Sequence, residues 1–231
     1  MRSVSVNRSW LGLLVAVALG AGCAGASPTP EPTPDPTAPR VGLPAGDYRS
    51  SAFVPPISYT LPDGWLVSGD APDYLGLEPV ASDLVGIHVF RSPRAASQDP
   101  ACPITPEPGV GTTAQELVEW IRARPGLVTG EPIAVSLGGL AGLQVDAAIV
   151  DGWGPSCPFA NGLPTVPLFV GAADTSFRWI VAGSERLRLE IFDVPGSGTI
   201  VVDIDAFDGS LMDDLLVSAT PIVRSMRFGL P

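Results

Sequence analysis

The segment 177–228 constrains the fold of this chain most, because it predicts three strands and a helix with almost no connecting residues. Arg186–Phe192 alternates polar and apolar residues, and the β-branched run Thr199–Ala206 follows after a Pro/Gly turn. Alternation at period two between such turns is typical of antiparallel strands packed on one face. An amphipathic helix opening at Gly209 and Ser210 would cover that face, with apolar residues at 211, 215, 219, 222 and 226.

The preceding part of the chain predicts more strands and one more helix. Strand patterns run over 57–61, 74–78, 84–91, 133–137, 140–150 and 166–170. Thr113 and Glu116 form a capping box for a helix that ends before Pro125. In the last helix, Pro221 predicts a kink or a new start. We therefore expect an α+β domain: an antiparallel sheet of about eight strands covered by two main helices, an αβα sandwich.

Residues 1–22 have the pattern of a signal peptide. The apolar stretch 10–19 follows two Arg residues and is too short to span a bilayer as a helix. Leu-Gly-Ala-Gly-Cys at 19–23 resembles the bacterial lipobox, so Cys23 is the predicted lipidation site and the first residue of the mature lipoprotein. The alternative is ordinary cleavage after Ala26, which would discard Cys23 and release a secreted protein.

Residues 23–46 predict a tether, and residues 47–231 a single globular domain. Ser27–Pro39 alternates Pro with small polar or acidic residues, so it cannot bury a core and should be extended, disordered chain. The expected location is the extracytoplasmic face of the cell membrane, with the lipid on Cys23 as anchor.

The charge of the chain excludes one class of partner. Without residues 1–22 the chain carries 11 Arg, 24 acidic residues and one His, which gives a net charge of −13. Such a surface repels nucleic acid and cannot act as a polybasic membrane anchor. Membrane contact is therefore expected only through the N-terminal lipid.

Three segments resemble the PsbP-like fold that many bacterial surface lipoproteins use. They are Tyr59–Trp65, the Gly-rich Leu137–Leu143 after the middle helix, and the closing stretch Ile222–Phe228. The Trp-x-x-x-Cys-Pro-Phe loop 153–159 is similar to one in lipoproteins of actinobacterial type. This resemblance covers 47–228 and implies an α+β sandwich. The fold serves photosystem accessory proteins and small binding proteins, so it specifies no ligand.

Cys102 and Cys157 remain after Cys23, and in an exported chain they should form a disulfide. Closing a loop of this length restricts the unfolded state by ~4 kcal/mol in the chain-entropy model. A redox or metal pair is the alternative, but the C-x-x-C spacing and additional His ligands for it are missing.

His88 is the only His in the chain, and period two places it on one strand face with Gly86 and Phe90. A serine triad would need a nucleophile elbow, and zinc catalysis would need more His ligands than one. We expect His88 to fill space or meet solvent. A catalytic role would require a cleft and a carboxylate within reach.

Asp203, Asp205 and Asp208 are weak candidates for a cation site. Asp203 and Asp205 share one strand face, but Asp208 is out of step and the closing Glu of a calcium loop is missing. The expectation is a solvated strand edge, with Asp208 or Ser210 capping the helix. We expect no metal and no cofactor.

Trp65, Trp153 and Phe159 are the candidate ligand surface, although aromatic residues this sparse are more often core. Taken together, these features predict a non-catalytic binding or accessory module of the cell envelope whose partner is an envelope protein or a small ligand. The alternative is a secreted hydrolase that uses carboxylates and the single His.

Overall fold

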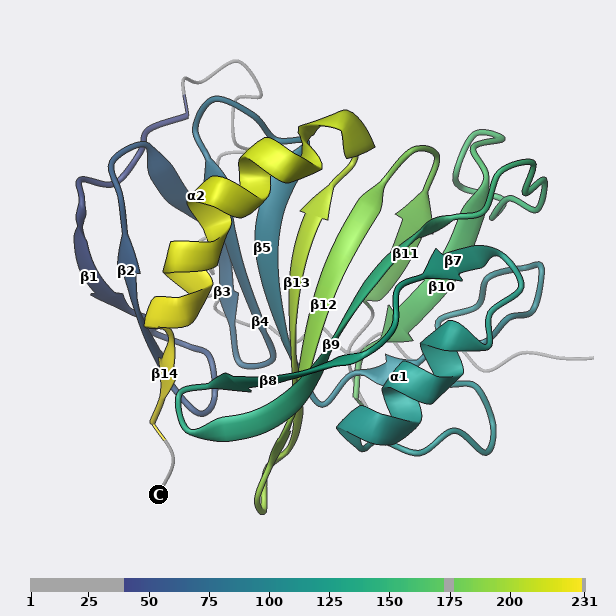
Figure 1. Cartoon of the computed structure of the whole chain (residues 1–231), viewed down its shortest axis with the longest axis horizontal. Coiled ribbons are helices and arrows are strands. Elements are labelled where there is room, and N and C mark those ends of the chain that lie inside the picture. Colours follow the sequence, from purple (N-terminus) through teal and green to yellow (C-terminus); the bar gives the residue numbers. More distant parts are fainter. Residues whose placement is uncertain (1–39, 173–176, 230–231) are drawn as a thin grey trace, which may run out of the picture. The chain divides into compact units, whose positions relative to one another are not determined.

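The computed structural model describes residues 40–172 and 177–229 (Figure 1). The predicted signal peptide, Cys23 and most of the tether lie outside these ranges. The elements are β1 (Gly46–Arg49), β2 (Ile57–Leu61), β3 (Trp65–Ala71), β4 (Tyr74–Pro79), β5 (Val85–Arg91), β6 (Arg94–Ala95), α1 (Ala114–Arg122), β7 (Leu127–Thr129), β8 (Ile133–Leu137), β9 (Leu140–Ile149), β10 (Thr165–Val170), β11 (Arg178–Ala182), β12 (Arg186–Val194), β13 (Gly198–Ala206), the 3-10 turn η1 (Gly209–Leu211), α2 (Met212–Ser225) and β14 (Arg227–Phe228).

An antiparallel sheet of eight strands organises the fold. Its order is β3-β4-β5-β13-β12-β9-β7, with β8 paired to β9. Two smaller sheets, β1-β2-β14 and β11-β10-β6, accompany it and were not expected. The predicted α+β class with an antiparallel sheet and two main helices is confirmed.

The two helices pack on opposite faces of the large sheet. Ala219 and Ile222 of α2 join a core with Val202 and Ile204 of β13. Leu117 of α1 joins a second core with residues of β12 and β10. Figure 1 shows α2 crossing in front of β5 and β13, both of which it contacts. The predicted αβα layering is therefore confirmed, and the β11-β10-β6 sheet shares the α1 side.

The local signals for both helices hold with one exception. The Thr113–Glu116 capping box opens α1 as predicted. Asp208 caps the short turn before α2 by accepting a 3.0 Å hydrogen bond from Ser210 N. Pro221 lies inside α2, which runs as one helix from Met212 to Ser225, so the expected alternative of a new helix start at Thr220 is wrong.

Cys102 and Cys157 form a disulfide, as predicted. The bond joins the loop between β6 and α1 to the loop between β9 and β10. Within the described ranges, none of the helices has the length and apolarity required to cross a membrane.

Candidate functional site

The central strand β13 divides its side chains between the two faces of the sheet. Val202 and Ile204 point into the core beneath α2. Asp203 and Asp205 take the other face, where Asp203 pairs in register with His88 of β5. Asp203 is 0% exposed and Asp205 is 8% exposed. The expected solvated strand edge is therefore wrong, because β13 lies inside the sheet between β5 and β12.

His88 stands between a phenol and a carboxylate. Its Nδ1 lies 2.8 Å from the Tyr74 hydroxyl, and its Nε2 lies 2.9 Å from Asp205 Oδ1. The second contact is within ion-pair distance, although no donor is aligned with that oxygen for a hydrogen bond. The Trp179 ring covers the imidazole with 4.5 Å between ring centroids. His88 thus has a carboxylate within reach, while only 8% of the residue is exposed.

Two glycines leave room for the contacts of His88 with Tyr74 and Asp205. A Cβ on Gly86 would lie 2.8 Å from His88 Nε2, and one on Gly76 would lie 2.6 Å from the Tyr74 hydroxyl. Both distances are below normal van der Waals contact. The close approach of Tyr74, His88 and Asp205 therefore depends on side chains being absent at these two strand positions.

Asp203 is the most deeply buried member of the group. Its Oδ2 accepts a 2.6 Å hydrogen bond from Trp179 Nε1, whereas its Oδ1 has no hydrogen-bond partner in the described part of the chain. Burial, followed by the negative charge of Asp205, raises the pKa of Asp203 well above its usual value. Burial therefore favours the protonated form of Asp203 more strongly than in an exposed Asp.

Glu185 is a third carboxyl group, and it comes from the turn between β11 and β12. It is 5% exposed, and its Oε2 accepts a 2.7 Å hydrogen bond from Ala182 N. Burial, followed by the charge of Asp205, raises the pKa of Glu185 to about 8. The arginines that form ion pairs in the described residues pair with other acids. We call the set Tyr74, His88, Glu185, Asp203 and Asp205 the acid–imidazole cluster.

A surface cavity of about 410 Å³ opens onto this cluster. Glu185 and Asp205 lie in its lining beside the hydrophobic side chains of Trp179, Ile180 and Phe207. Phe207 is 42% exposed, so this wall of the cavity faces solvent. We call this cavity the acidic pocket. His88 lies behind Asp205 and does not line it.

The predicted ligand-surface residues are not part of the lining of the acidic pocket. Trp153 lines a second cavity of about 430 Å³ beside the Cys102–Cys157 bond, and its Nε1 donates to Thr165 O at 3.0 Å. Phe159 is exposed beneath the Arg178 guanidinium, which lies 4.3 Å from the ring centroid. Trp65 is 4% exposed and belongs to the core under α2, so it is not a surface residue.

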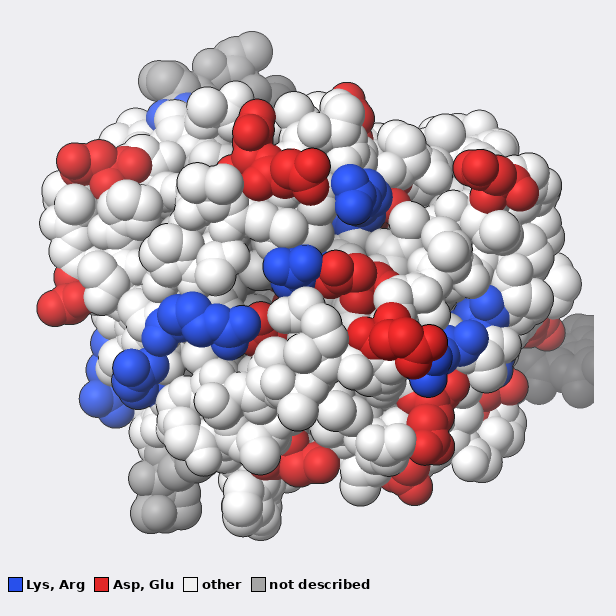
Figure 2. Space-filling view, viewed as in Figure 1, with Lys and Arg blue, Asp and Glu red and all other residues white. Residues whose placement is uncertain are grey.

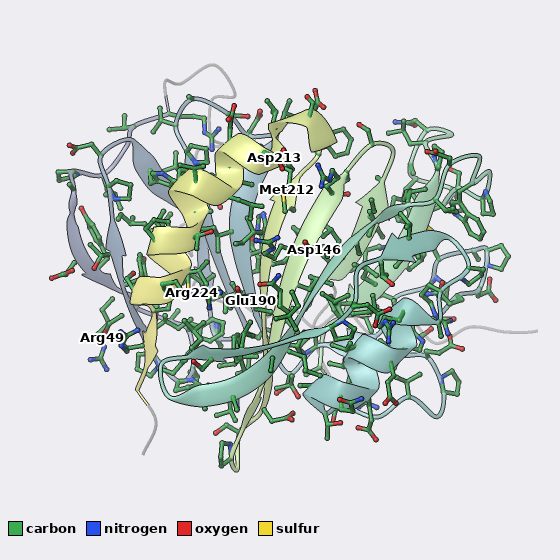
Figure 3. All side chains as sticks on the ribbon, in the orientation of Figure 1. Arg49, Asp146, Glu190, Met212, Asp213 and Arg224 are labelled. Atoms are coloured by element: carbon green, nitrogen blue, oxygen red, sulfur yellow. A yellow bond between two sulfur atoms is a disulfide. The ribbon has the colours of Figure 1, made fainter. Side chains whose placement is uncertain are left out.

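The α2 side of the sheet carries charges of a different kind. Figure 2 shows acidic and basic side chains interspersed on this face. Arg188 holds Asp146 through two 2.8 Å hydrogen bonds, and Arg224 holds Glu190 through bonds of 2.5 and 2.9 Å. Figure 3 shows Glu190 and Arg224 close together near the C-terminal end of α2. Each of these acids has its own countercharge.

The three aspartates named as weak metal candidates separate into two places. Asp203 and Asp205 are in the acid–imidazole cluster, whereas Asp208 is exposed and serves as a cap. Among the residues that the structure describes, no group of three or more His, Cys, Asp or Glu is placed to hold a metal ion.

No protein-family model matches this sequence, and no curated protein matches it significantly. Solved structures with some similarity include a protein from Bacteroides thetaiotaomicron (8% identity, TM-score 0.35, covering 75% of this chain and 45% of that one). Another is the solution structure of cyanobacterial PsbP (CyanoP) from Synechocystis sp. PCC 6803, with 12% identity and a TM-score of 0.36 over 80% of this chain and 94% of that chain. The chain thus spans less than half the length of the Bacteroides protein.

Proposed function

We propose that this chain is a lipid-anchored, extracytoplasmic binding module of the cell envelope and that it binds a small ligand in the acidic pocket. The observation that carries the proposal is the pocket itself: two buried carboxyl groups, Glu185 and Asp205, beside hydrophobic walls at the surface. Buried acids without an Arg partner are costly to maintain, and perturbed carboxyl groups in a cavity are typical of functional sites.

The anchoring part of the proposal rests on the sequence. A lipobox-like stretch ending at Cys23 and the Pro-rich run Ser27–Pro39 fit a domain held at a distance from the membrane. At about 3.1 Å per residue, such an extended tether would place the domain tens of ångströms from its anchor.

A test uses native mass spectrometry on full-length protein extracted from its own host's membranes. We expect an acylated Cys23 and an extra non-covalent mass. Ile180→Trp fills the pocket and should lose that mass. Val217→Trp, at an exposed position of α2 on the other side of the sheet, is the matched control and should retain it. A mass that survives Ile180→Trp would place the ligand elsewhere. Recovery only from the medium, with Ser27 as first residue, would exclude the anchor.

A secreted hydrolase is the second candidate, and one observation favours it. Glu185 holds a proton at neutral pH beside the carboxyl group of Asp205, a pairing that can serve general acid–base chemistry. The single His does not support this role directly, because His88 lies behind Asp205 and does not reach the pocket. Hydrolysis of any substrate that Glu185→Gln abolishes and Asp214→Asn preserves would establish the enzyme.

A further inference from the structure

The charged groups around the acidic pocket are unbalanced. Glu185 and Asp205 form part of its lining, and Asp83 contributes a third acid. Arg178 is the only basic residue among the described lining residues. Its Nη1 donates to Cys102 O at 2.8 Å, and its guanidinium lies over Phe159, so its charge is engaged outside the carboxyl pair.

Among the described residues that line the pocket, Asp205 has one carboxyl oxygen without a hydrogen-bond donor. Asp205 is 92% buried on the basis of its 8% exposure, and its Oδ1 has no aligned hydrogen-bond donor. Oδ1 itself is closed off from the pocket, so a ligand N–H would reach Asp205 at the part of the residue that lines the pocket. The existing neighbour, His88 Nε2, approaches the same oxygen without making a hydrogen bond.

The hydrophobic lining residues of the pocket indicate what the uncharged part of the ligand is. Trp179 and Phe207 present aromatic surface, and Leu84 and Ile180 present aliphatic surface. Aromatic faces attract a cation and also pack against an apolar group. A fully hydrated metal ion would make no use of these walls, whereas an organic cation would use both the walls and the acids.

We propose that the acidic pocket binds a primary ammonium group carried on a small apolar body, and that the ligand enters in exchange for a proton. This inference rests on the proposed function, since it names the ligand class of the same pocket. The ammonium N–H groups donate to the carboxylates of Asp205 and Glu185, and the apolar body packs against Trp179 and Phe207.

The exchange follows from the protons that the cluster already holds. At neutral pH, burial keeps Glu185 protonated, with its pKa at about 8. An ammonium ion beside it stabilises the carboxylate, so the Glu185 O–H bond breaks and its proton goes to solvent while the ligand keeps its own charge. The titratable and charged groups of the cluster and the pocket around Glu185 are Asp203 and Asp205 of β13, His88 of β5, Tyr74 of β4, Asp83 before β5 and Arg178 of β11.

The experiment is calorimetric titration with benzylammonium chloride and with benzyl alcohol, which keeps the ring and a donor but has no charge. Titrations at pH 7 in two buffers of different ionisation enthalpy give the number of protons released. We expect at least tenfold tighter binding of benzylammonium, release of close to one proton, and affinity that rises severalfold from pH 6.5 to 8. The indole resonance of Trp179 should shift on binding, which locates the probe.

Variants separate the parts of this inference. Glu185→Gln keeps the shape of the side chain, and it should abolish proton release and the pH dependence of affinity. Asp205→Asn should weaken binding at every pH. Asp214→Asn on exposed α2 removes the same charge on the other side of the sheet and should behave as wild type. Thermal melts establish that each variant folds.

Equal affinity for benzyl alcohol and benzylammonium would overturn the ligand class and leave the pocket as a binding site. Tight benzylammonium binding without proton release, or release that persists in Glu185→Gln, would overturn the exchange. Failure of both probes to bind overturns the inference; whether the proposed function also falls is decided separately, by the presence or absence of a co-purified mass that Ile180→Trp removes.

Discussion

Two glutamates five residues apart, Glu185 and Glu190, are both buried against the large sheet but have different charged neighbours. Glu190 of β12 is 1% exposed and faces the α2 side, where Arg224 reaches down from α2 and binds it with two hydrogen bonds. Glu185, just before β12, is 5% exposed and belongs to the acid–imidazole cluster on the other side, beside Asp205. Both are buried, but among the residues that the structure describes only Glu190 has an arginine as countercharge.

The difference appears in the protonation of the two groups. Burial raises the pKa of both, but the positive charge of Arg224 opposes the increase at Glu190, whereas the negative charge of Asp205 adds to it at Glu185. A buried ion pair needs no exchangeable proton, while an acid next to other acids does. The comparison therefore separates a structural acid on the α2 side from a proton-holding acid at a pocket.

The largest effect expected is the removal of the Glu185 carboxyl group. Its folded-state pKa of about 8 lies above the unfolded value, so its contribution to stability is fully present at low pH. That contribution is lost as pH rises through 8. Wild type should thus lose about 4 kcal/mol of unfolding free energy between pH 4 and pH 9 from this group alone.

Glu185→Gln should remove that part of the slope. Urea unfolding at pH 5 and pH 9 measures it: the variant and wild type should be similar at pH 5, and the variant should be more stable at pH 9. Glu131→Gln, which changes an exposed acid, is the control and should follow wild type. Parallel pH profiles for wild type and Glu185→Gln would show that Glu185 is ionised in the folded protein at neutral pH.

The next largest effect on stability is expected when Glu190, like Glu185, has no arginine as countercharge. Arg224→Met removes the countercharge and leaves a buried carboxylate, which should cost about 3 kcal/mol at pH 8, at the lower end for breaking such a pair because Arg224 is partly exposed. The pKa of Glu190 should rise further, so the loss should shrink at pH 5, where the group gains a proton.

Chemical unfolding at the two pH values tests this expectation, with exposed Arg49→Met as the control. Arg224→Met combined with Glu190→Gln should recover much of the stability at pH 8. If Arg224→Met costs the same at both pH values, the loss comes from packing of the long side chain and the electrostatic part of the comparison fails.

The strand pattern alone predicted which side chains share a face, and this part held. Period two placed His88 with Gly86 and Asp203 with Asp205, and the β5–β13 register brings the two sets together. The strand pattern could not predict which element packs over this face of the sheet. β11 closes over this face as part of a separate three-stranded sheet, and no local signal in Arg178–Ala182 distinguishes that position from one in the main sheet.

Glu185 was missed for a related reason. It follows Gly183 and Ser184 in a turn, where an acidic residue ordinarily meets solvent. Part of the increase in its pKa comes from Asp205, which is 20 residues further along the chain. Trp65 follows a Pro-Asp-Gly turn and enters the core as that turn predicts, whereas its place among the candidate ligand-surface residues does not fit its burial under α2. Contacts between residues far apart in the sequence determine the surroundings of Glu185 and Trp65, and the spacing of residue types along the chain does not encode those contacts.

The smallest effect expected tests the geometry of the cluster. Gly86→Ala would place a Cβ 2.8 Å from His88 Nε2 and 3.3 Å from Leu77 O, so the imidazole must move away from Asp205. We expect a loss of about 1 kcal/mol, since the better strand propensity of Ala partly offsets the crowding. Gly46→Ala in β1 is the control, because its Cβ would meet only Tyr48 at 3.8 Å, and it should be neutral or slightly stabilising.

The His88 ring resonances should shift in Gly86→Ala alone. Unchanged ring resonances together with wild-type stability would mean that the imidazole of His88 does not lie against Gly86, and the placement of His88 in the acid–imidazole cluster would then fail.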